Sequence, residues 1–402
     1  MRVCFVTGEY PPMEGGVGDY TRQLAEALRP LEVEAYIVTS LAADPFRAQG
    51  RGRKPVPAGP LLLPIMRRWN FAAWRWVEAV VNRSGCDIVH LQYQAAAFGM
   101  HAAVNLMPWW LHRRTQARFV TTMHDLRTPY LFPKAGPLRP WANRFLVRHS
   151  DAVIATNQED YQELQNVLSR RDTLHVIPIG SNLPGEPPRG YDRGRLRAKL
   201  GAAEGEFLLS YFGFLNRSKG VEYLLRAIRM LLDKGLKVRL VMVGATTGYS
   251  DVSNRMYRRE VLALAKGLGL GEAVLWPGFL PPAEASAHLL ASDACVLPFQ
   301  DGASFRRGTL IAALAHGLPT ITTEPAYTGE HAGALPRLVS GENCLLVPPG
   351  DGVALASAVE GLMASTELTE RLVQETRKLS QSFTWKGIAE KHLQVYKELL
   401  SA

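Results

Sequence analysis

A chain of 402 residues, of which 47% are hydrophobic and 21% charged, is long enough to bury the cores of two globular domains. Its net charge of +9 suits nucleic acid, anionic lipid or a phosphorylated substrate as a partner, and it also suits solubility alone. No interleaved aromatic pattern or zinc-ligand spacing favours nucleic acid, and no apolar run reaches the roughly 18 residues of a membrane span.

The cysteines and the first residues indicate a reducing compartment. The four cysteines are widely separated and lie mostly in strand-like runs, so we predict reduced core thiols at Cys4, Cys86, Cys295 and Cys344. The opening segment, MRVCFVTGEY, has the pattern of a buried strand and lacks the apolar core of a signal peptide. We therefore expect a cytoplasmic protein, either free or peripheral to the inner face of the membrane.

The first predicted strand, Arg2–Thr7, leads into a glycine-rich loop. A helix is predicted over Tyr20–Leu28, and it is preceded by Gly15, Gly16, Val17 and Gly18. Glycine lets a backbone approach a bulky ligand closely, and a helix start offers N–H donors to an anion. The loop is therefore a candidate ligand site, although it lacks the GxGxxG spacing of dinucleotide-binding proteins.

Strand-like runs alternate with helical segments over the first half of the chain, which predicts a parallel sheet. One of these runs, Phe119–Met123, ends at His124. Residues at the carboxyl end of such a strand border the ligand site of an open α/β sheet. His124 is therefore a candidate catalytic residue, and the alternative is a histidine satisfied by a backbone carbonyl.

A segment dense in tryptophan, Arg67–Val81, is predicted to be helical. Trp69 and Trp76 are seven positions apart and would share one face of that helix. The face would pack in the core, or it would form a lipid-facing stripe beside Arg67 and neighbouring arginines.

The composition changes to proline, glycine and charge over Asn182–Gly194, as in a hinge. A second α/β unit begins with the strand Phe207–Phe212, and a glycine-containing loop then carries Lys219 to the start of the helix Val221–Leu232. A lysine beside glycine at a helix start can place a point charge on a phosphate, although surface lysines are common there.

A stronger candidate for anion binding follows the strand Ala294–Phe299. A turn with Arg306 and Arg307 ends where Thr309 is predicted to cap the helix Leu310–His316. Free N–H groups and two guanidiniums would then meet at the carboxyl end of a strand, which suits a phosphate. The alternative is an ordinary strand–turn–helix unit with two solvated arginines.

Motifs in order along both halves resemble the retaining family-4 glycosyltransferases, which have the GT-B fold. The similar segments are EYPPMEGGVGDY (9–20), TTMHDLR (121–127), GFLNRSKG (213–220), GFL (278–280) and ALAHGLPTI (313–321). The resemblance covers almost the whole chain. It implies an α/β protein with two doubly wound, Rossmann-like parallel-sheet domains facing a central cleft. The expected parts are an acceptor-side domain (1–182), a donor-binding domain (195–384) and a C-terminal helix crossing back to the first domain (385–402).

The same resemblance implies roles for individual residues. His124 would lie beside the transferred sugar, and Lys219 with Arg217 would act on the donor diphosphate. The other donor-binding residues would be Gly15, Gly16, Val17, Gly18, Gly213, Phe279, Ser304, Arg306, Arg307, Gly308 and Thr309. The family needs neither a metal ion nor a cofactor.

Three positions depart from the family pattern. The family has two glutamates that contact the donor sugar and ribose, whereas Phe305 and Ala312 stand at the positions that we match to them. Phe214 stands where the family has an arginine for the diphosphate. Donor recognition would then depend on the arginines and on Lys219.

The implied activity is transfer of a sugar, with retention, from a nucleotide-diphosphate sugar to a hydroxyl acceptor. The acceptor would be lipid-linked or a glycan, with peripheral membrane contact as one option and no role for nucleic acid. Two alternatives remain. The protein could bind a sugar or lipid phosphate without catalysis, or it could be an epimerase or hydrolase of sugar nucleotides.

Overall fold

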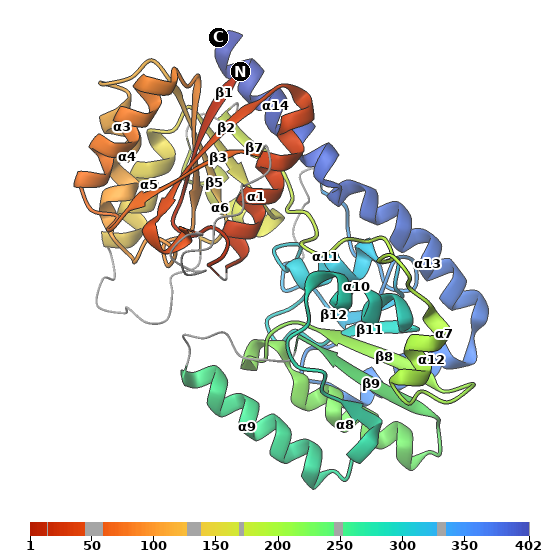
Figure 1. The fold of residues 1–402 in the computed structure, drawn as a ribbon. Helices are drawn as coiled ribbons and strands as arrows, with labels where there is room; N and C mark the ends of the chain where they lie inside the picture. Colours follow the sequence, from red (N-terminus) through yellow and green to blue (C-terminus); the bar gives the residue numbers. More distant parts are fainter. Residues whose placement is uncertain are drawn as a thin grey trace. The chain divides into compact units, whose positions relative to one another are not determined.

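In a computed structural model, the structure describes residues 1–13, 15–44, 59–126, 138–168, 173–244, 252–327 and 335–401, and they form two compact units (Figure 1). The first unit contains the described residues up to Gly180 together with those from Trp385 onward. The second contains most of the described residues between Ser181 and Thr384. The predicted GT-B class, with two parallel-sheet α/β domains, is confirmed.

The first unit is built on a seven-stranded parallel sheet in the order β3-β2-β1-β4-β5-β6-β7. Its strands are β1 (Arg2–Thr7), β2 (Glu34–Ser40), β3 (Leu61–Met66), β4 (Ile88–Tyr93), β5 (Arg118–Met123), β6 (Ala152–Ala155) and β7 (Leu174–Val176). Strand β3 was not predicted, because Pro64 interrupts an otherwise apolar run. A proline is tolerated there because β3 lies at the edge of the sheet.

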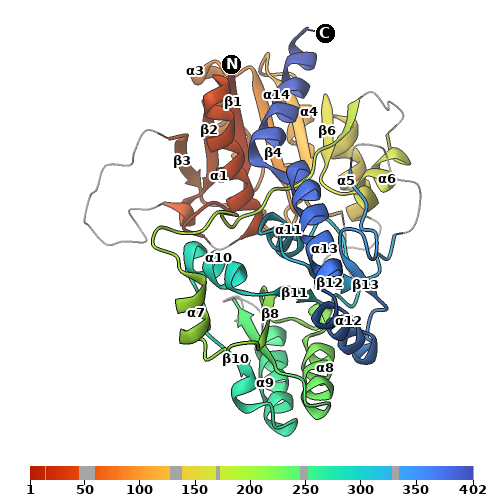
Figure 2. The ribbon, with the colours of Figure 1, turned by 90° about the vertical axis from the view of Figure 1, so that its right-hand side faces the viewer.

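Helices cover both faces of this sheet. They are α1 (Gly16–Leu28), α3 (Ala72–Ser84), α4 (Met107–Leu111), α5 (Leu138–Arg148), α6 (Gln158–Gln165) and α14 (Trp385–Ser401). Helices α3, α4 and α5 lie on one face, and α1 and α14 lie together on the other (Figures 1 and 2). Within the described ranges, no helix combines the length and apolar character that crossing a bilayer requires.

The alternation of side chains along β1 explains the two layers. Cys4 and Val6 join the cluster under α3, α4 and α5, whereas Val3 and Phe5 join the cluster under α1 and α14. Successive residues of a strand point to opposite faces, so a strand buried on both sides is apolar throughout. All four cysteines are buried and none forms a disulfide bond, as predicted.

The prediction for the tryptophan-rich segment is wrong in its boundaries. Helix α3 begins at Ala72, so Trp69 precedes it and packs in the core, where its indole N–H donates to Ser40 Oγ at 3.0 Å. Trp76 is on the helix, but it is 57% exposed. The two rings therefore do not share a face, because the chain turns before the helix starts.

The second unit is built on a six-stranded parallel sheet in the order β10-β9-β8-β11-β12-β13. Its strands are β8 (Phe207–Phe212), β9 (Val238–Val243), β10 (Val274–Leu275), β11 (Ala294–Leu297), β12 (Thr320–Thr323) and β13 (Leu345–Val347). Its helices are α7 (Arg193–Lys199), α8 (Val221–Asp233), α9 (Val252–Gly267), α10 (Pro282–Ala291), α11 (Gly308–Ala315), α12 (Gly352–Ala364) and α13 (Thr366–Ser380). Thr309 does not cap α11, because the helix already begins at Gly308 with Arg307 at the cap position.

Buried polar contacts attach α14 to strand β4 and to helix α1. His90 Nδ1 lies 2.6 Å from the Tyr396 hydroxyl, and His392 Nε2 lies 3.2 Å from the Tyr20 hydroxyl. Burial lowers the pKa of His392 to about 4 and that of His90 well below its usual value. Burial likewise lowers the pKa of His124 to about 3. The first unit therefore holds these three imidazoles neutral.

We predict that the first unit loses stability as the pH falls from about 6.5 toward 4. The unfolded chain binds protons at these histidines near pH 6.5 while the folded unit does not, and each proton changes the free energy of unfolding by up to about 1.4 kcal/mol per pH unit. Urea unfolding followed by tryptophan fluorescence would report mainly on this unit, since every tryptophan except Trp276 lies in it.

The variant His392→Gln should flatten this pH dependence by about one proton. An unfolding free energy that stays constant between pH 7 and pH 5 would contradict neutral buried imidazoles.

Candidate functional site

The loop that carries Lys219 is attached to the segment between β11 and α11. Arg217–Lys219 form a short 3-10 turn, and Gly220 follows with φ of 61°. A side chain at Gly220 would overlap the carbonyl oxygen of Pro298 and the amide of Gln300. The Gln300 backbone N–H also donates to the Ser218 carbonyl at 2.8 Å. Only glycine permits both this left-handed conformation and this close packing, and the packing brings Lys219 to the start of α11.

Lys219 is a buried cation. The residue is 8% exposed, and its Nζ donates to Thr309 Oγ1 at 3.3 Å and lies 4.7 Å from the centre of the Phe299 ring. The guanidinium of Arg307 lies 4.8 Å from the same ring and pairs with Asp301. Burial and, second, the charge of Arg307 lower the pKa of Lys219 to about 7, and Asp301 acts in the opposite direction. An anionic ligand would stabilise the protonated form.

The start of α11 adds backbone donors to this cation. Among the described residues, no acceptor lies within hydrogen-bonding distance of the amides of Gly308 and Thr309. A Cβ at Gly213 would lie 3.0 Å from the Thr309 methyl group and 3.8 Å from Lys219 Nζ. The glycine therefore keeps the space beside the amine open. We call Gly213, Lys219, Arg307, Gly308 and Thr309 the cationic group.

Other predicted donor residues lie near this group in the chain, but the structure does not bring all of them to it. Arg217 has a side chain that is 70% exposed and makes two hydrogen bonds to Glu260, at 2.7 and 2.8 Å. It is therefore directed to α9 rather than to Lys219. Phe279, in the loop after β10, is 70% exposed. Ser304 Oγ accepts from the Arg306 amide at 3.4 Å, and both residues are partly buried.

Sequence analysis matched the two family glutamates to Phe305 and Ala312, and both positions are part of the packed interior. The family pair is eight positions apart, however, so counting back from Ala312 places the first glutamate at Ser304 rather than at Phe305. Phe305 is 9% exposed, and its ring centre lies 4.8 Å from that of Phe383. Ala312 is 1% exposed, and its carbonyl accepts from His316 Nδ1 at 2.6 Å. Neither side chain can accept a hydrogen bond from a sugar or ribose hydroxyl. Phe214, at the arginine position, is 48% exposed.

In the first unit, the glycine-rich loop binds an anion that belongs to the chain itself. The amides of Val17 and Gly18 donate to Glu9 Oε1 at 3.0 and 3.3 Å. Gly16 is exposed, and a Cβ there would have nothing within 4 Å. Sequence analysis missed Glu9. An acidic residue between a strand and a helix start was the signal that could have found it.

His124 directly follows β5, as predicted, and its Nε2 lies 2.8 Å from Gln92 Oε1. The edge of its ring contacts Tyr20 at a centroid distance of 4.7 Å. Because its pKa is about 3, the ring is neutral at physiological pH and can exchange hydrogen bonds but carries no charge. Gln92 is fully buried and was also missed. It lies two positions after His90, so it points to the same face of the sheet.

Two family models together match most of the chain. Residues 15–180 match the family described as glycosyl transferase 4-like domain, and residues 206–365 match glycosyl transferases group 1. The chain belongs to the group 1 glycosyltransferases with the GT-B fold.

Individual relatives of this glycosyltransferase cover most of its length. The D-inositol 3-phosphate glycosyltransferase of Nocardia farcinica is 25% identical over 95% of this chain and 80% of its own length. The alpha-monoglucosyldiacylglycerol synthase of Streptococcus pneumoniae is 23% identical over 93% and 81%. The crystal structure of HepE from Anabaena in complex with UDP-glucose matches with a TM-score of 0.71 and 18% identity, covering 100% of both chains.

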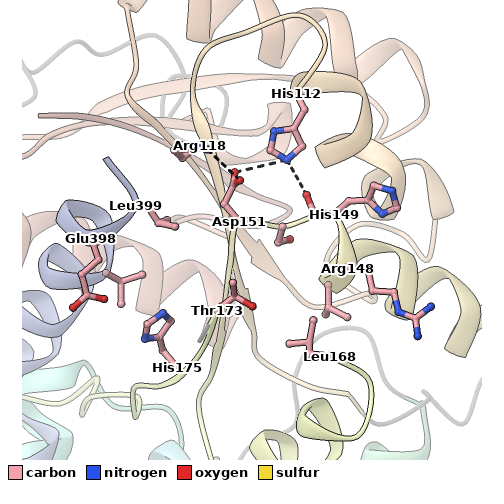
Figure 3. Close-up of a pocket in the computed structure, with 13 residues that line it drawn as sticks. His112, Arg118, Arg148, His149, Asp151, Leu168, Thr173, His175, Glu398 and Leu399 are labelled. Carbon is pink, nitrogen blue, oxygen red and sulfur yellow. Dashed lines mark hydrogen bonds and ion pairs between the residues drawn. The ribbon is translucent and has the colours of Figure 1, made fainter. Parts of the chain in front are cut away.

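A cavity of about 730 Å³ lies at the amino ends of strands in the first sheet, the end opposite to His124 (Figure 3). Residues at the starts of β5, β6 and β7 and in the last turns of α14 line it. Asp151 accepts from the Phe119 amide at 2.6 Å and lies near Arg118 and His112, at 3.8 and 3.7 Å. Ligands of open α/β sheets bind at the carboxyl ends of the strands, so this cavity is not the glycosyltransferase site.

We predict that Lys219→Ala lowers kcat by about 10²-fold or more, because the amine would stabilise charge that grows as the diphosphate departs. Arg217→Ala is the matched variant from the same turn, and it should retain activity within a few-fold because its partner is Glu260. Initial rates and melting temperatures of both proteins test this. Equal losses of activity in the two variants would remove the distinction between them.

Proposed function

We propose that this glycosyltransferase moves a sugar, with retention of anomeric configuration, from a nucleotide-diphosphate sugar to the hydroxyl of an acceptor at a membrane surface. The observation that carries the proposal is the cationic group. A buried lysine, a neighbouring arginine and the free amides of a helix start converge at the carboxyl end of a parallel sheet. HepE, which has the same fold, binds UDP-glucose.

In this proposal the donor is recognised chiefly through its diphosphate. Neither Ser304 nor Ala312 has a carboxylate, so the ribose and sugar hydroxyls lose the contacts that the family's glutamates make. Arg307 can bind phosphate through two N–H groups, and each charge-assisted bond contributes roughly 1.5–3 kcal/mol. The exposed ring of Phe279 offers a face on which a base can stack.

The bond that breaks joins the anomeric carbon of the sugar to the oxygen of the diphosphate. Negative charge grows on that oxygen, and Lys219 and Arg307 stabilise it, so the step needs no metal ion. The acceptor hydroxyl attacks from the face that the diphosphate leaves, and its proton passes to the departing phosphate oxygen. Asp301 is paired with Arg307 and Glu9 with two amides, so neither carboxylate is available as a nucleophile.

The pKa of Lys219 makes the strength of this site depend on pH. In the free protein the amine is about half protonated near pH 7, and a bound diphosphate raises its pKa by favouring the charged form. Donor binding above pH 7 therefore takes up a proton. The affinity is constant below that pH and falls as the pH rises through it.

The outer surface of α3, α4 and α5 motivates a membrane-bound acceptor. It exposes large aromatic side chains, with exposed fractions between 37% and 57%, at Phe71, Trp76, Trp109 and Trp141. Arg113 and Arg114 lie over the rings of Trp109 and Trp110, at 4.4 and 4.7 Å. Tryptophan and arginine together suit the interface of an anionic bilayer. The similar streptococcal protein is named as a synthase of a glucosylated diacylglycerol.

Incubation with a panel of nucleotide sugars, with and without lipid acceptors, tests the activity. Nucleotide release should require an acceptor, and NMR of the product should show the anomeric configuration of the donor. A 2′-deoxyribose donor should bind almost as well as its parent, since no glutamate contacts the ribose. Arg307→Ala should weaken donor binding more than Arg306→Ala.

Each rival function gives a different result in that experiment. Release without acceptor would indicate a hydrolase or epimerase, and tight binding without release would indicate a binding protein. Inversion of the anomeric centre would contradict the proposed displacement. Strong rejection of the deoxy donor together with indifference to both arginine changes would contradict recognition through the phosphates.

Membrane contact is tested with vesicles of phosphatidylglycerol and of phosphatidylcholine. We expect sedimentation with the anionic vesicles only, weakening as salt rises. The double variant Trp76→Ser/Trp141→Ser should reduce binding about tenfold, since burying apolar rings in the interface drives it. Met256→Ser, which alters an equally exposed apolar side chain of the second unit, serves as the control. Equal binding of both variants and the parent would contradict this surface.

A further inference from the structure

The glycine-rich loop of the first unit is held by a carboxylate. Glu9 leaves β1, and its Oε1 accepts from the amides of Val17 and Gly18 in the first turn of α1, at 3.0 and 3.3 Å. Helix α1 has 13 residues and no other side-chain cap. A negative charge at this position satisfies N–H groups that have no partner within the helix and interacts favourably with the helix dipole.

Position 15 needs a glycine because of the space that the Glu9 carboxylate occupies, not because of its backbone conformation. Its φ of 175° and ψ of 141° are extended values that any residue can adopt. A Cβ at Gly15, however, would overlap the carboxyl group of Glu9. At Gly16, the next residue, a Cβ would meet nothing within 4 Å. The two adjacent glycines therefore differ: one makes room for Glu9, and the other faces open space.

We propose that Glu9 is a positioning residue of the transferase site, which occupies the anion position at the start of α1 and holds the loop with Gly16 exposed. This rests on the proposed function only in its link to catalysis. The carboxylate accepts hydrogen bonds from the amides of Val17 and Gly18, so these amides are not available to a diphosphate. Among the described residues of the loop, Gly16 remains exposed to a ligand.

A double-mutant cycle tests the pairing of Glu9 with Gly15. Gly15→Ala should lower the melting temperature of the parent protein by several degrees, and Gly16→Ala should leave it nearly unchanged. In a Glu9→Ala background the effect of Gly15→Ala should largely disappear, since the overlapping group is gone. An equal effect of Gly15→Ala in both backgrounds would overturn the proposal.

Chemical rescue separates a carboxylate at the helix start from a general packing role. Glu9→Ala should melt about 2–4 °C below the parent, and acetate should restore most of that loss relative to chloride at equal ionic strength. Glu26→Ala removes an exposed carboxylate from the same helix, where Glu26 pairs with Arg22 at 3.7 Å, and it should not respond to acetate. Equal responses of the two variants would also overturn the proposal.

Two further measurements complete the test. Glu9→Gln keeps an acceptor oxygen but loses the charge, so it should melt only slightly below the parent, which keeps the proposal testable where Glu9→Ala does not fold. In transfer assays Glu9→Ala should raise the donor KM several-fold more than it lowers kcat, with recovery in acetate. The melting and rescue results stand without any activity, so failure of the proposed function would be recognised separately.

Discussion

The burial of Lys219 beside Arg307 is the constraint on which the proposed chemistry depends. Two cations share the ring of Phe299, and Asp301 opposes them, so positive charge accumulates in a site shielded from water. The lysine pKa falls to about 7, and a lowering of this size represents several kcal/mol at about 1.4 kcal/mol per pKa unit. The unfolded chain protonates this amine below about pH 10.5, so the second unit loses stability as the pH falls from there toward 7. A bound diphosphate would reverse this cost, since it favours the charged amine.

Sequence reasoning recovered the fold because the strands carry strong local signals. Phe207–Phe212 is apolar on both faces and was predicted with its observed ends, and the glycine and lysine that follow it mark a helix start. Strand β3 was not predicted. Its proline argues against a strand unless the strand is known to lie at the edge of a sheet. Helix α11 was predicted to begin after Thr309, but Arg307 takes the cap position, and its side chain makes no capping hydrogen bond to the helix. Side-chain capping preferences therefore could not find this boundary.

The residue types of the site were predictable from the sequence, but the side-chain contacts that those residues make were less so. Lys219, Arg307 and Thr309 were expected from one-dimensional motifs, and the structure brings them together because Gly220 packs on the exit of β11. Arg217 lies in the same turn, yet Glu260, 43 positions along the chain, takes its guanidinium. Glu9 and Gln92 were missed for a similar reason. Their importance comes from what they contact across a loop or between strands, and a single sequence does not show those contacts.

The two units therefore contribute chemically different surfaces. The surroundings of His124 and Glu9 in the first unit carry little net charge, because burial holds His90, His124 and His392 neutral and the Glu9 carboxylate accepts from the first amides of α1. The second unit concentrates cations and unpaired amides around Lys219. In the proposed function, the cations of the second unit would bind the diphosphate, whereas neutral imidazole and amide groups such as those of His124 and Gln92 could orient hydroxyl groups without attracting anions. Loss of the two family glutamates fits the same division, since Ser304 and Ala312 place no carboxylate in this segment of the second unit. The charge balance of the second unit is thereby shifted further toward phosphate, and specificity for the sugar must come from neutral hydrogen-bonding groups.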